Sequence, residues 1–153
     1  MGFTEVMLRR YMRDITSLGS IVVSGLLIVY FYLTRQWRIA NILVLGSVMC
    51  VAIPAVIRKV YFKKRPRTQE YHSSLEKLDA SSFPSVHATR SFFFAYSLSY
   101  YFQNEILSIF FFALAALISY TRIYLKKHDW VDITVGVILG VIIGALLHFF
   151  TMF

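Results

Sequence analysis

The sequence predicts an all-α fold, a polytopic membrane helical bundle of about five transmembrane helices preceded by a short interfacial helix. Of the 153 residues, 58% are hydrophobic, and the mean hydropathy is +0.62. The apolar residues form long blocks, each close to the ~20 residues that a helix needs to cross roughly 30 Å of hydrocarbon. Because these blocks are apolar on all sides, a soluble helical core, which would need polar stripes, is disfavoured.

The expected spans cover residues 15–33, 39–62, 86–102, 106–125 and 130–153. Residues 1–14 differ from them, because arginines are mixed with apolar side chains, and they are expected to lie in the interface as an amphipathic helix. A secretory signal peptide would have a shorter apolar run, so no cleavage is expected. The single cysteine, Cys50, rules out a disulfide framework, and the lack of repeats and linkers predicts one domain over residues 1–153.

The net charge is +8, and six of the sixteen Lys and Arg residues lie between Arg58 and Arg67. One interpretation is a juxtamembrane patch that attracts anionic lipid or sets the membrane topology. The other is a binding site for phosphate. Nucleic acid is disfavoured as a partner, because a basic run at the end of a transmembrane helix is held against lipid headgroups.

The expected connectivity brings the polar segments together. Successive spans alternate in direction, so the loops over residues 63–85 and 121–129 open on the same side of the membrane. The loop over residues 103–105 opens on the other side and has no histidine and no basic residue. This asymmetry is typical of an active site that faces one side of the membrane.

His128 and Asp132 are four residues apart and therefore share a helix face. A carboxylate in that position can fix the imidazole tautomer and leave the second ring nitrogen free to attack. Asp129 points about 100° away and is a poorer partner. The alternative for both aspartates is a favourable charge at a helix N-terminus.

Ser85 is expected to cap the helix that begins the third span. The N-terminus of a helix binds anions readily, and His87 would face an anion held there. Arg90 is unusual at its depth in the span. It either adds to this anion site or pairs with Glu76 or Asp79, and the sequence leaves both options open.

In order and spacing, three segments resemble the signature of the type 2 phosphatidic acid phosphatase superfamily, K-x6-RP, PSGH and SR-x5-H-x3-D. Here they are Arg58-x6-Arg65-Pro66, Pro84-Ser85-Val86-His87 and Thr121-Arg122-x5-His128-x3-Asp132. Arg58 replaces the usual lysine, with Lys59 beside it, while Val86 replaces glycine and Thr121 replaces serine. The family commonly has six spans, one more than is expected here.

The resemblance implies a membrane lipid phosphatase with a phosphohistidine intermediate. His128 would attack phosphorus, Asp132 would orient it, and His87 would protonate the leaving oxygen. The phosphate-binding residues would be Arg58 or Lys59, Arg65, Ser85, Thr121 and Arg122. No metal or other cofactor is implied.

The implied partners are the bilayer and a lipid phosphate of the polyprenyl diphosphate, phosphatidic acid, phosphatidylglycerol phosphate or lipid A type. The expected location is a bacterial cytoplasmic membrane. A phosphotransferase on the same scaffold and a noncatalytic anionic-lipid-binding protein are the alternatives. The sequence leaves open the headgroup, the side that the site faces and the oligomeric state. His72 and His148 have no partner readable from the sequence and are assigned structural roles, and the loop around Glu70 and Tyr71 is long enough for a lid.

Overall fold

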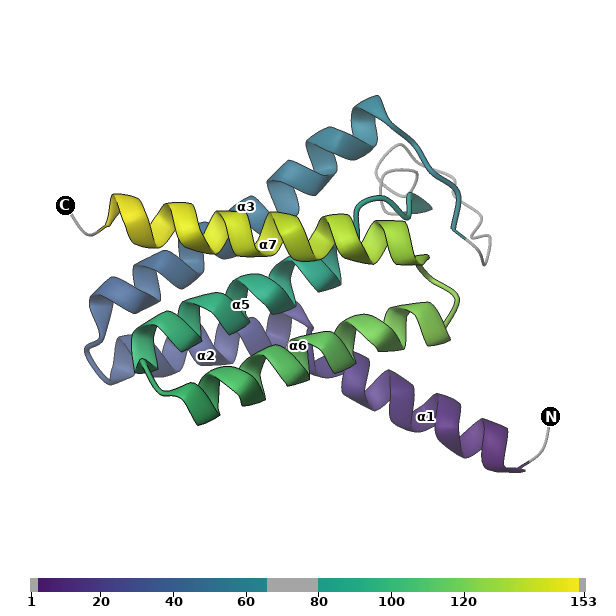
Figure 1. Cartoon of the computed structure of the whole chain (residues 1–153), viewed down its shortest axis with the longest axis horizontal. Coiled ribbons are helices and arrows are strands. Elements are labelled where there is room, and N and C mark those ends of the chain that lie inside the picture. The colour runs from purple at the N-terminus through teal and green to yellow at the C-terminus, as the bar shows by residue number, and fades with distance from the viewer. Residues whose placement is uncertain (1–2, 66–79, 152–153) are drawn as a thin grey trace.

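A computed structural model describes residues 3–65 and 80–151, which fold into six helices (Figure 1). These are α1 (Phe3–Leu18), α2 (Ile21–Leu33), α3 (Trp37–Val60), α5 (Val86–Phe102), α6 (Glu105–Tyr124) and α7 (Trp130–Phe150). In these two ranges, the only bridge between extended segments pairs Lys64 with Ser81. The predicted all-α class is therefore confirmed.

Four stretches of the described chain are long and apolar enough to cross a membrane, namely Thr4–Leu33, Trp37–Val60, Glu105–Tyr124 and Trp130–Phe150. The fifth expected span coincides with α5, whose 17 residues lie at the short end of the usual range. The membrane helical bundle is thus confirmed for four spans, and the fifth stays a prediction.

The helix break near the N-terminus lies four residues later than the expected boundary. The expected change from interfacial helix to span fell between residues 14 and 15, but α1 continues to Leu18 and the break falls at Gly19 and Ser20. The physical reason is local, because the Ser20 side chain accepts the Val23 N–H and caps α2. At 1.5 Å per residue, the 13 residues of α2 extend only about 20 Å, so the Thr4–Leu33 stretch needs part of α1 to cross. The interfacial position of residues 1–14 remains a prediction.

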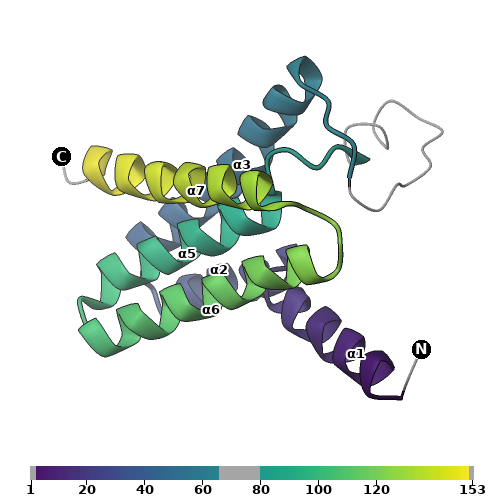
Figure 2. The same ribbon diagram turned by 45° about the vertical axis from the view of Figure 1, so that its right-hand side comes forward.

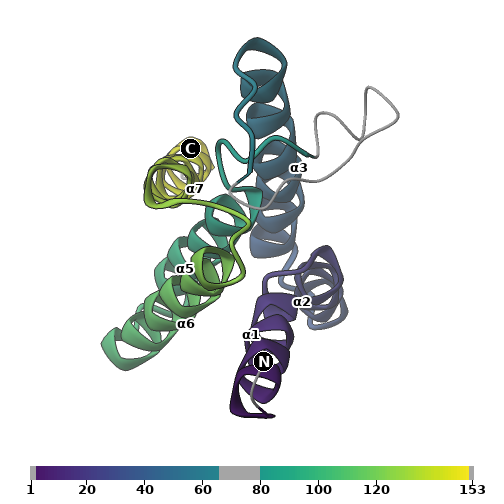
Figure 3. The same cartoon turned by 90° about the vertical axis from the view of Figure 1, so that its right-hand side faces the viewer.

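Helix α5 lies at the centre of the bundle and packs against α3, α6 and α7 (Figure 3). The hydrophobic core joins Phe93, Phe94 and Leu98 of α5 to side chains of α2, α3 and α7. Helix α3 runs obliquely behind α5 and α7 (Figures 1 and 2). The α6–α7 loop and the start of α1 lie at one end of the bundle, opposite the C-terminus.

Small residues allow α7 to approach α5 closely. Gly136, Gly140 and Gly144 are four residues apart and therefore share one face of α7. A Cβ atom added at Gly140 would lie 2.2 Å from the Thr89 carbonyl oxygen of α5, which no real contact permits. This close packing holds the N-terminal ends of α5 and α7 side by side.

Candidate active site

A cavity of about 580 Å³ opens at the end of the bundle where α6 joins α7. Its described lining includes five cationic side chains and no acidic one. The five are Arg58, Arg65, Arg90, Arg122 and Lys127. So many positive charges around one cavity produce a strong attraction for a multiply charged anion.

Helix α3 contributes the first wall of the cavity. Val51, Ala55 and Arg58 line it and share one helix face by their spacing. Arg58 is only 8% exposed, and its Nη2 donates to the Pro84 carbonyl oxygen at 2.9 Å, which ties α3 to the start of α5. Lys59 is exposed and is not among the lining residues. Of the two cations that the sequence left open, the structure brings Arg58 into the cavity.

The N-terminus of α5 contributes a second wall. Ser85 is the N-cap, as expected, and its hydroxyl accepts the Ala88 N–H at 3.4 Å. Val86 and His87 line the cavity in the first turn, where backbone N–H groups have no partner within the helix. The Ser85 side chain is fully buried and is not among the lining residues. The side chain of Val86 forms part of the cavity wall. The related motif has glycine at this position.

The α6–α7 loop brings His128 to the cavity, which His87 also lines. His128 is 3% exposed, and its Nδ1 lies 3.6 Å from Oδ2 of the fully buried Asp132. This distance is longer than a hydrogen bond but brings the carboxylate to one side of the ring. Burial lowers the pKa of His128 below its ordinary value, and Asp132 opposes that effect while Arg122 adds to it. The imidazole is therefore neutral near pH 7, as a nucleophile must be.

Asp132 is held by its neighbours as well as by the helix. Asp129 is the N-cap of α7, and the two aspartates form a capping box in which each side chain accepts the other's backbone N–H, at 3.0 and 3.1 Å. The Ser85 N–H also donates to the Asp132 carbonyl oxygen at 3.1 Å. The sequence left open that both aspartates are only favourable charges at a helix N-terminus. Asp129, the N-cap of α7, has that role.

Lys63 belongs to this cluster and was not predicted. Its Nζ lies 2.9 Å from Oδ1 of Asp132 and 2.5 Å from Oδ2 of Asp129. Desolvation lowers the pKa of Lys63, but the bonds to the two carboxylates outweigh it and raise the pKa above its ordinary value. Lys63 is thus a fixed positive charge behind Asp132. The only signal in the sequence was its place in the basic run after α3.

Thr121 and Arg122 occupy different positions at the end of α6. Arg122 is buried and lines the cavity, as expected. The Thr121 hydroxyl instead donates to the Ile118 carbonyl oxygen at 2.6 Å and bonds to the hydroxyl of Thr16 in α1. Thr16 itself lines the cavity, so α1 also contributes to the site, which the sequence did not suggest.

The motif residues of α3, α5, α6 and α7 therefore meet at one end of the bundle. A model of the PAP2 superfamily matches residues 37–152 of the chain. The chain belongs to the PAP2 superfamily. No match is found among curated proteins.

Two solved membrane proteins share this PAP2 fold. LpxE from Aquifex aeolicus superposes with a TM-score of 0.78 at 24% identity, covering 93% of this chain and 86% of that one. A transmembrane PAP2-type phosphatidylglycerolphosphate phosphatase from Bacillus subtilis superposes with a TM-score of 0.77, also at 24% identity. That match covers 95% of this chain and 77% of the other. At this identity, the likeness establishes the fold.

Arg90 connects the PAP2 cavity to the break between α1 and α2. It is buried, lines the cavity, and donates to the Gly19 carbonyl oxygen through Nε at 3.1 Å and also through Nη2. Of the two options left open by the sequence, the place in the cationic site is observed. The other candidate partners, Glu76 and Asp79, lie outside the described residues. So do Pro66, His72 and the expected lid residues Glu70 and Tyr71.

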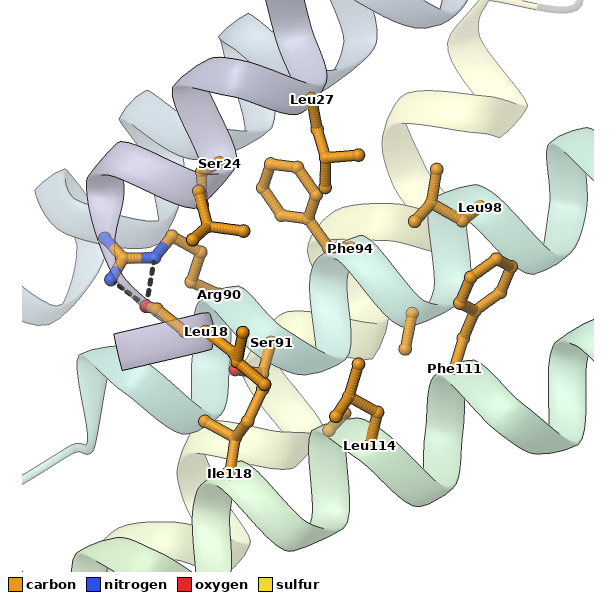
Figure 4. A pocket seen from close by; sticks show the side chains of 14 residues that line it. Leu18, Ser24, Leu27, Arg90, Ser91, Phe94, Leu98, Phe111, Leu114 and Ile118 are labelled. Atoms are coloured by element: carbon orange, nitrogen blue, oxygen red, sulfur yellow. Dashed lines mark hydrogen bonds between the residues drawn. The ribbon is translucent and has the colours of Figure 1, made fainter. Parts of the chain in front are cut away.

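Arg90 also borders a second, apolar pocket of about 140 Å³ in this PAP2 bundle. Figure 4 shows Leu27, Phe94 and Phe111 around it, with Arg90 at one end, bonded to the backbone. The pocket lies among α2, α5 and α6. The apolar pocket and the cationic cavity therefore share Arg90 as a lining residue.

The carboxylates and imidazoles of the site are not arranged as a metal centre. In residues 3–65 and 80–151, no group of three His, Cys, Asp or Glu side chains could hold a metal ion. The cluster behind His128 contains two carboxylates and an ammonium group instead. What the cavity offers a ligand is positive charge, N–H donors and two imidazoles.

Proposed function

We propose that the protein is a membrane lipid phosphatase that hydrolyses a phosphate or diphosphate from a lipid through a phosphohistidine intermediate. The observation that supports this most strongly is the meeting of His87, His128 and Arg122 in one cationic cavity. Membership of the PAP2 superfamily adds to that support. The names of the two solved relatives, LpxE and a phosphatidylglycerolphosphate phosphatase, point the same way.

In the first step, Arg58, Arg65 and Arg122 hold the nonbridging oxygens of the phosphate and stabilise the charge of the transition state. Asp132 faces Nδ1 of His128, which leaves Nε2 to attack phosphorus. The bond between phosphorus and the bridging oxygen breaks, and His87 donates a proton to the leaving oxygen. The products are the dephosphorylated lipid and phosphohistidine at His128.

In the second step, His87 takes a proton from water as the water oxygen attacks phosphorus. The bond between phosphorus and nitrogen breaks, inorganic phosphate leaves, and His128 returns to its neutral form. Asp132 stabilises the positive imidazole in between, while Lys63 and the Asp129 N–H keep the carboxylate charged and in place. Ser85 and Thr121 support the backbone around the phosphate in this proposal, since their hydroxyls bond to protein groups.

The surroundings of the cavity support a lipid as the substrate. The apolar pocket of Figure 4 meets the cationic cavity at Arg90, so a phosphate in the cavity has hydrocarbon-binding surface beside it. A polyprenyl or glycerolipid phosphate in a bacterial cytoplasmic membrane meets both requirements. Its hydrocarbon chain would remain in the bilayer while the headgroup enters the cavity.

The proposal is tested by trapping the intermediate. Purified protein is mixed with lipid carrying a ³²P-labelled terminal phosphate and quenched in alkali, under which phosphohistidine survives. We expect the label on the wild-type protein and its absence from His128→Gln. Vanadate, which resembles the transition state, should prevent labelling at low concentration.

Lys126→Gln serves as a matched control, because it changes an exposed residue of the same loop that does not line the cavity, and it should be labelled like the wild type. Labelling of His128→Gln at the wild-type level would overturn the proposed nucleophile. Analysis of the products then separates hydrolysis from transfer, since inorganic phosphate appears only when water is the acceptor.

A further inference from the structure

The end of the bundle opposite the catalytic cavity contains a second polar cavity. The α2–α3 turn, the α5–α6 turn and the last turn of α7 all lie at this end (Figure 1). The cavity has a volume of about 270 Å³, and its lining includes Gln36, Arg38, Tyr100, Gln103 and His148. None of the described lining residues is acidic.

His148 is the most informative residue of this cavity. It is 4% exposed, and its Nε2 is buried and has no hydrogen-bond partner within residues 3–65 and 80–151. The rings of Tyr100 and Tyr96 lie 4.3 and 6.1 Å from its own ring. Leaving a buried polar atom unsatisfied costs about 1–3 kcal/mol. An apolar side chain would fill the same space without that cost, so packing alone does not account for a histidine here.

The start of α3 provides an anion-binding group at the same cavity. Its N-cap, Gln36, makes no side-chain capping bond to the first N–H groups of this 24-residue helix. The positive end of the helix dipole therefore faces this region. Arg38 adds a full charge, and its Nη2 donates to the Thr151 carbonyl oxygen at 2.6 Å, which fixes the guanidinium between α3 and α7.

We propose that this cavity binds a phosphate oxyanion, carried by the headgroup of an anionic phospholipid in the leaflet opposite the catalytic cavity. The guanidinium of Arg38, the α3 N-terminus and the His148 imidazole would donate to its oxygens. The cavity lies at the helix ends, where headgroups lie, and the exposed Trp37 and Tyr101 are aromatic residues typical of that depth. A free phosphate ion has the same oxyanion chemistry, but lacks the chains that would lie along the exposed apolar faces of these helices.

The first experiment compares two arginines of the same turn. The full chain in zwitterionic detergent is titrated with phosphatidylglycerol, and bound lipid is counted by native mass spectrometry. Arg38→Gln is expected to weaken retention of one lipid about tenfold, the effect of losing about 1.4 kcal/mol. Arg35→Gln removes an exposed charge that does not line the cavity, and should retain that lipid. Because both variants keep the catalytic cavity, the difference between them reports the second site alone.

The second experiment observes the imidazole directly. In ¹⁵N-histidine NMR spectra, the Nε2 signal of His148, assigned by its loss in His148→Asn, should move on addition of phosphatidylglycerol. Inorganic phosphate at the same concentration should leave it in place. Movement with inorganic phosphate alone would overturn the lipid assignment, and no movement with either, or equal lipid retention by the two arginine variants, would overturn the site. Phosphatase activity of Arg38→Gln should stay near wild type, so these outcomes are independent of the proposed catalysis.

Discussion

Each end of the bundle buries a histidine, and the two differ in what surrounds them. His128 has the Asp132 carboxylate on one side of its ring and a cavity with five cationic residues on the other. His148 lies against two tyrosine rings, with Arg38 as the one charged residue in the described lining of its cavity. Burial alone therefore does not identify a catalytic histidine. What distinguishes His128 is the carboxylate beside its imidazole together with the cationic residues that line the same cavity.

The largest difference between the two ends should appear in catalysis. His128→Ala removes the proposed nucleophile, and we expect phosphate release to fall by at least about a thousandfold. His148→Asn should stay within about twofold of wild type, measured per folded molecule in detergent. Similar losses in both variants would mean that the two imidazoles do not have the different roles assigned to them.

The comparison can be sharpened within α3, where two adjacent cations differ in position. Arg58→Gln removes a buried charge from the cavity, and we expect kcat/KM to fall about a hundredfold, as when a donor to the transition state is lost. Lys59→Gln changes an exposed residue outside the lining and should have less than a twofold effect. A larger loss of kcat/KM in Lys59→Gln than in Arg58→Gln would show that Lys59, and not Arg58, binds the phosphate.

Close contact between α5 and α7 links the two ends, and it can be broken without touching either histidine. Gly140→Ala places a methyl group against the Thr89 carbonyl, so the helices must separate, at a cost of about 1–3 kcal/mol. The expected result is a lower unfolding midpoint in detergent and reduced activity. Gly25→Ala is the matched control, because nothing lies within 4 Å of the added carbon, and it should be neutral or slightly stabilising.

The smallest effect should be a shift in pH dependence. Burial lowers the pKa of His128, so the acid limb of activity should lie below pH 6.5, where the imidazole finally gains a proton. Asp132 opposes this lowering, so Asp132→Asn should move the limb to still lower pH while reducing the rate. The substrate ionises in the same way in both experiments, so the difference between the two pH profiles reports on the protein. A limb that moves to higher pH in Asp132→Asn would contradict the assigned pairing.

The pKa of His128 also predicts how the stability of the protein changes with pH. The folded pKa of His128 is below the unfolded value, so its neutral form contributes stability above pH 6.5, and that contribution is lost as the pH falls below 6.5. Unfolding midpoints measured between pH 7.5 and pH 5 should therefore decrease in the wild type. His128→Gln should show a smaller decrease.

Most helices could be predicted from the sequence because apolar blocks of bilayer length have few alternatives. The expected span at residues 86–102 coincides with α5, and the one at 106–125 differs from α6 by one residue at each end. The motif residues could be placed on one side of the membrane because spans alternate. The structure then brings Arg58, Arg65, His87, Arg122 and His128 into one cavity.

What could not be predicted depends on contacts between distant residues. Lys63 meets Asp132 across 69 positions, and Thr16 meets Thr121 across 105, so neither pair leaves a local pattern. The break at Gly19 was missed because the apolar block continues through it. The cap at Ser20 is local, but the bond from Arg90 to the Gly19 carbonyl oxygen spans 71 positions.

The central position of α5 has a consequence for biogenesis. This helix carries His87, Arg90 and several hydroxyl side chains, which are expensive to transfer singly from water into hydrocarbon. The strongly apolar α6 follows it after a short turn. We therefore expect α5 to enter the bilayer during synthesis as a hairpin with α6, whose apolar residues offset the cost of those polar groups. The helix that brings His87 to the cationic cavity would then depend for its insertion on sequence that follows it.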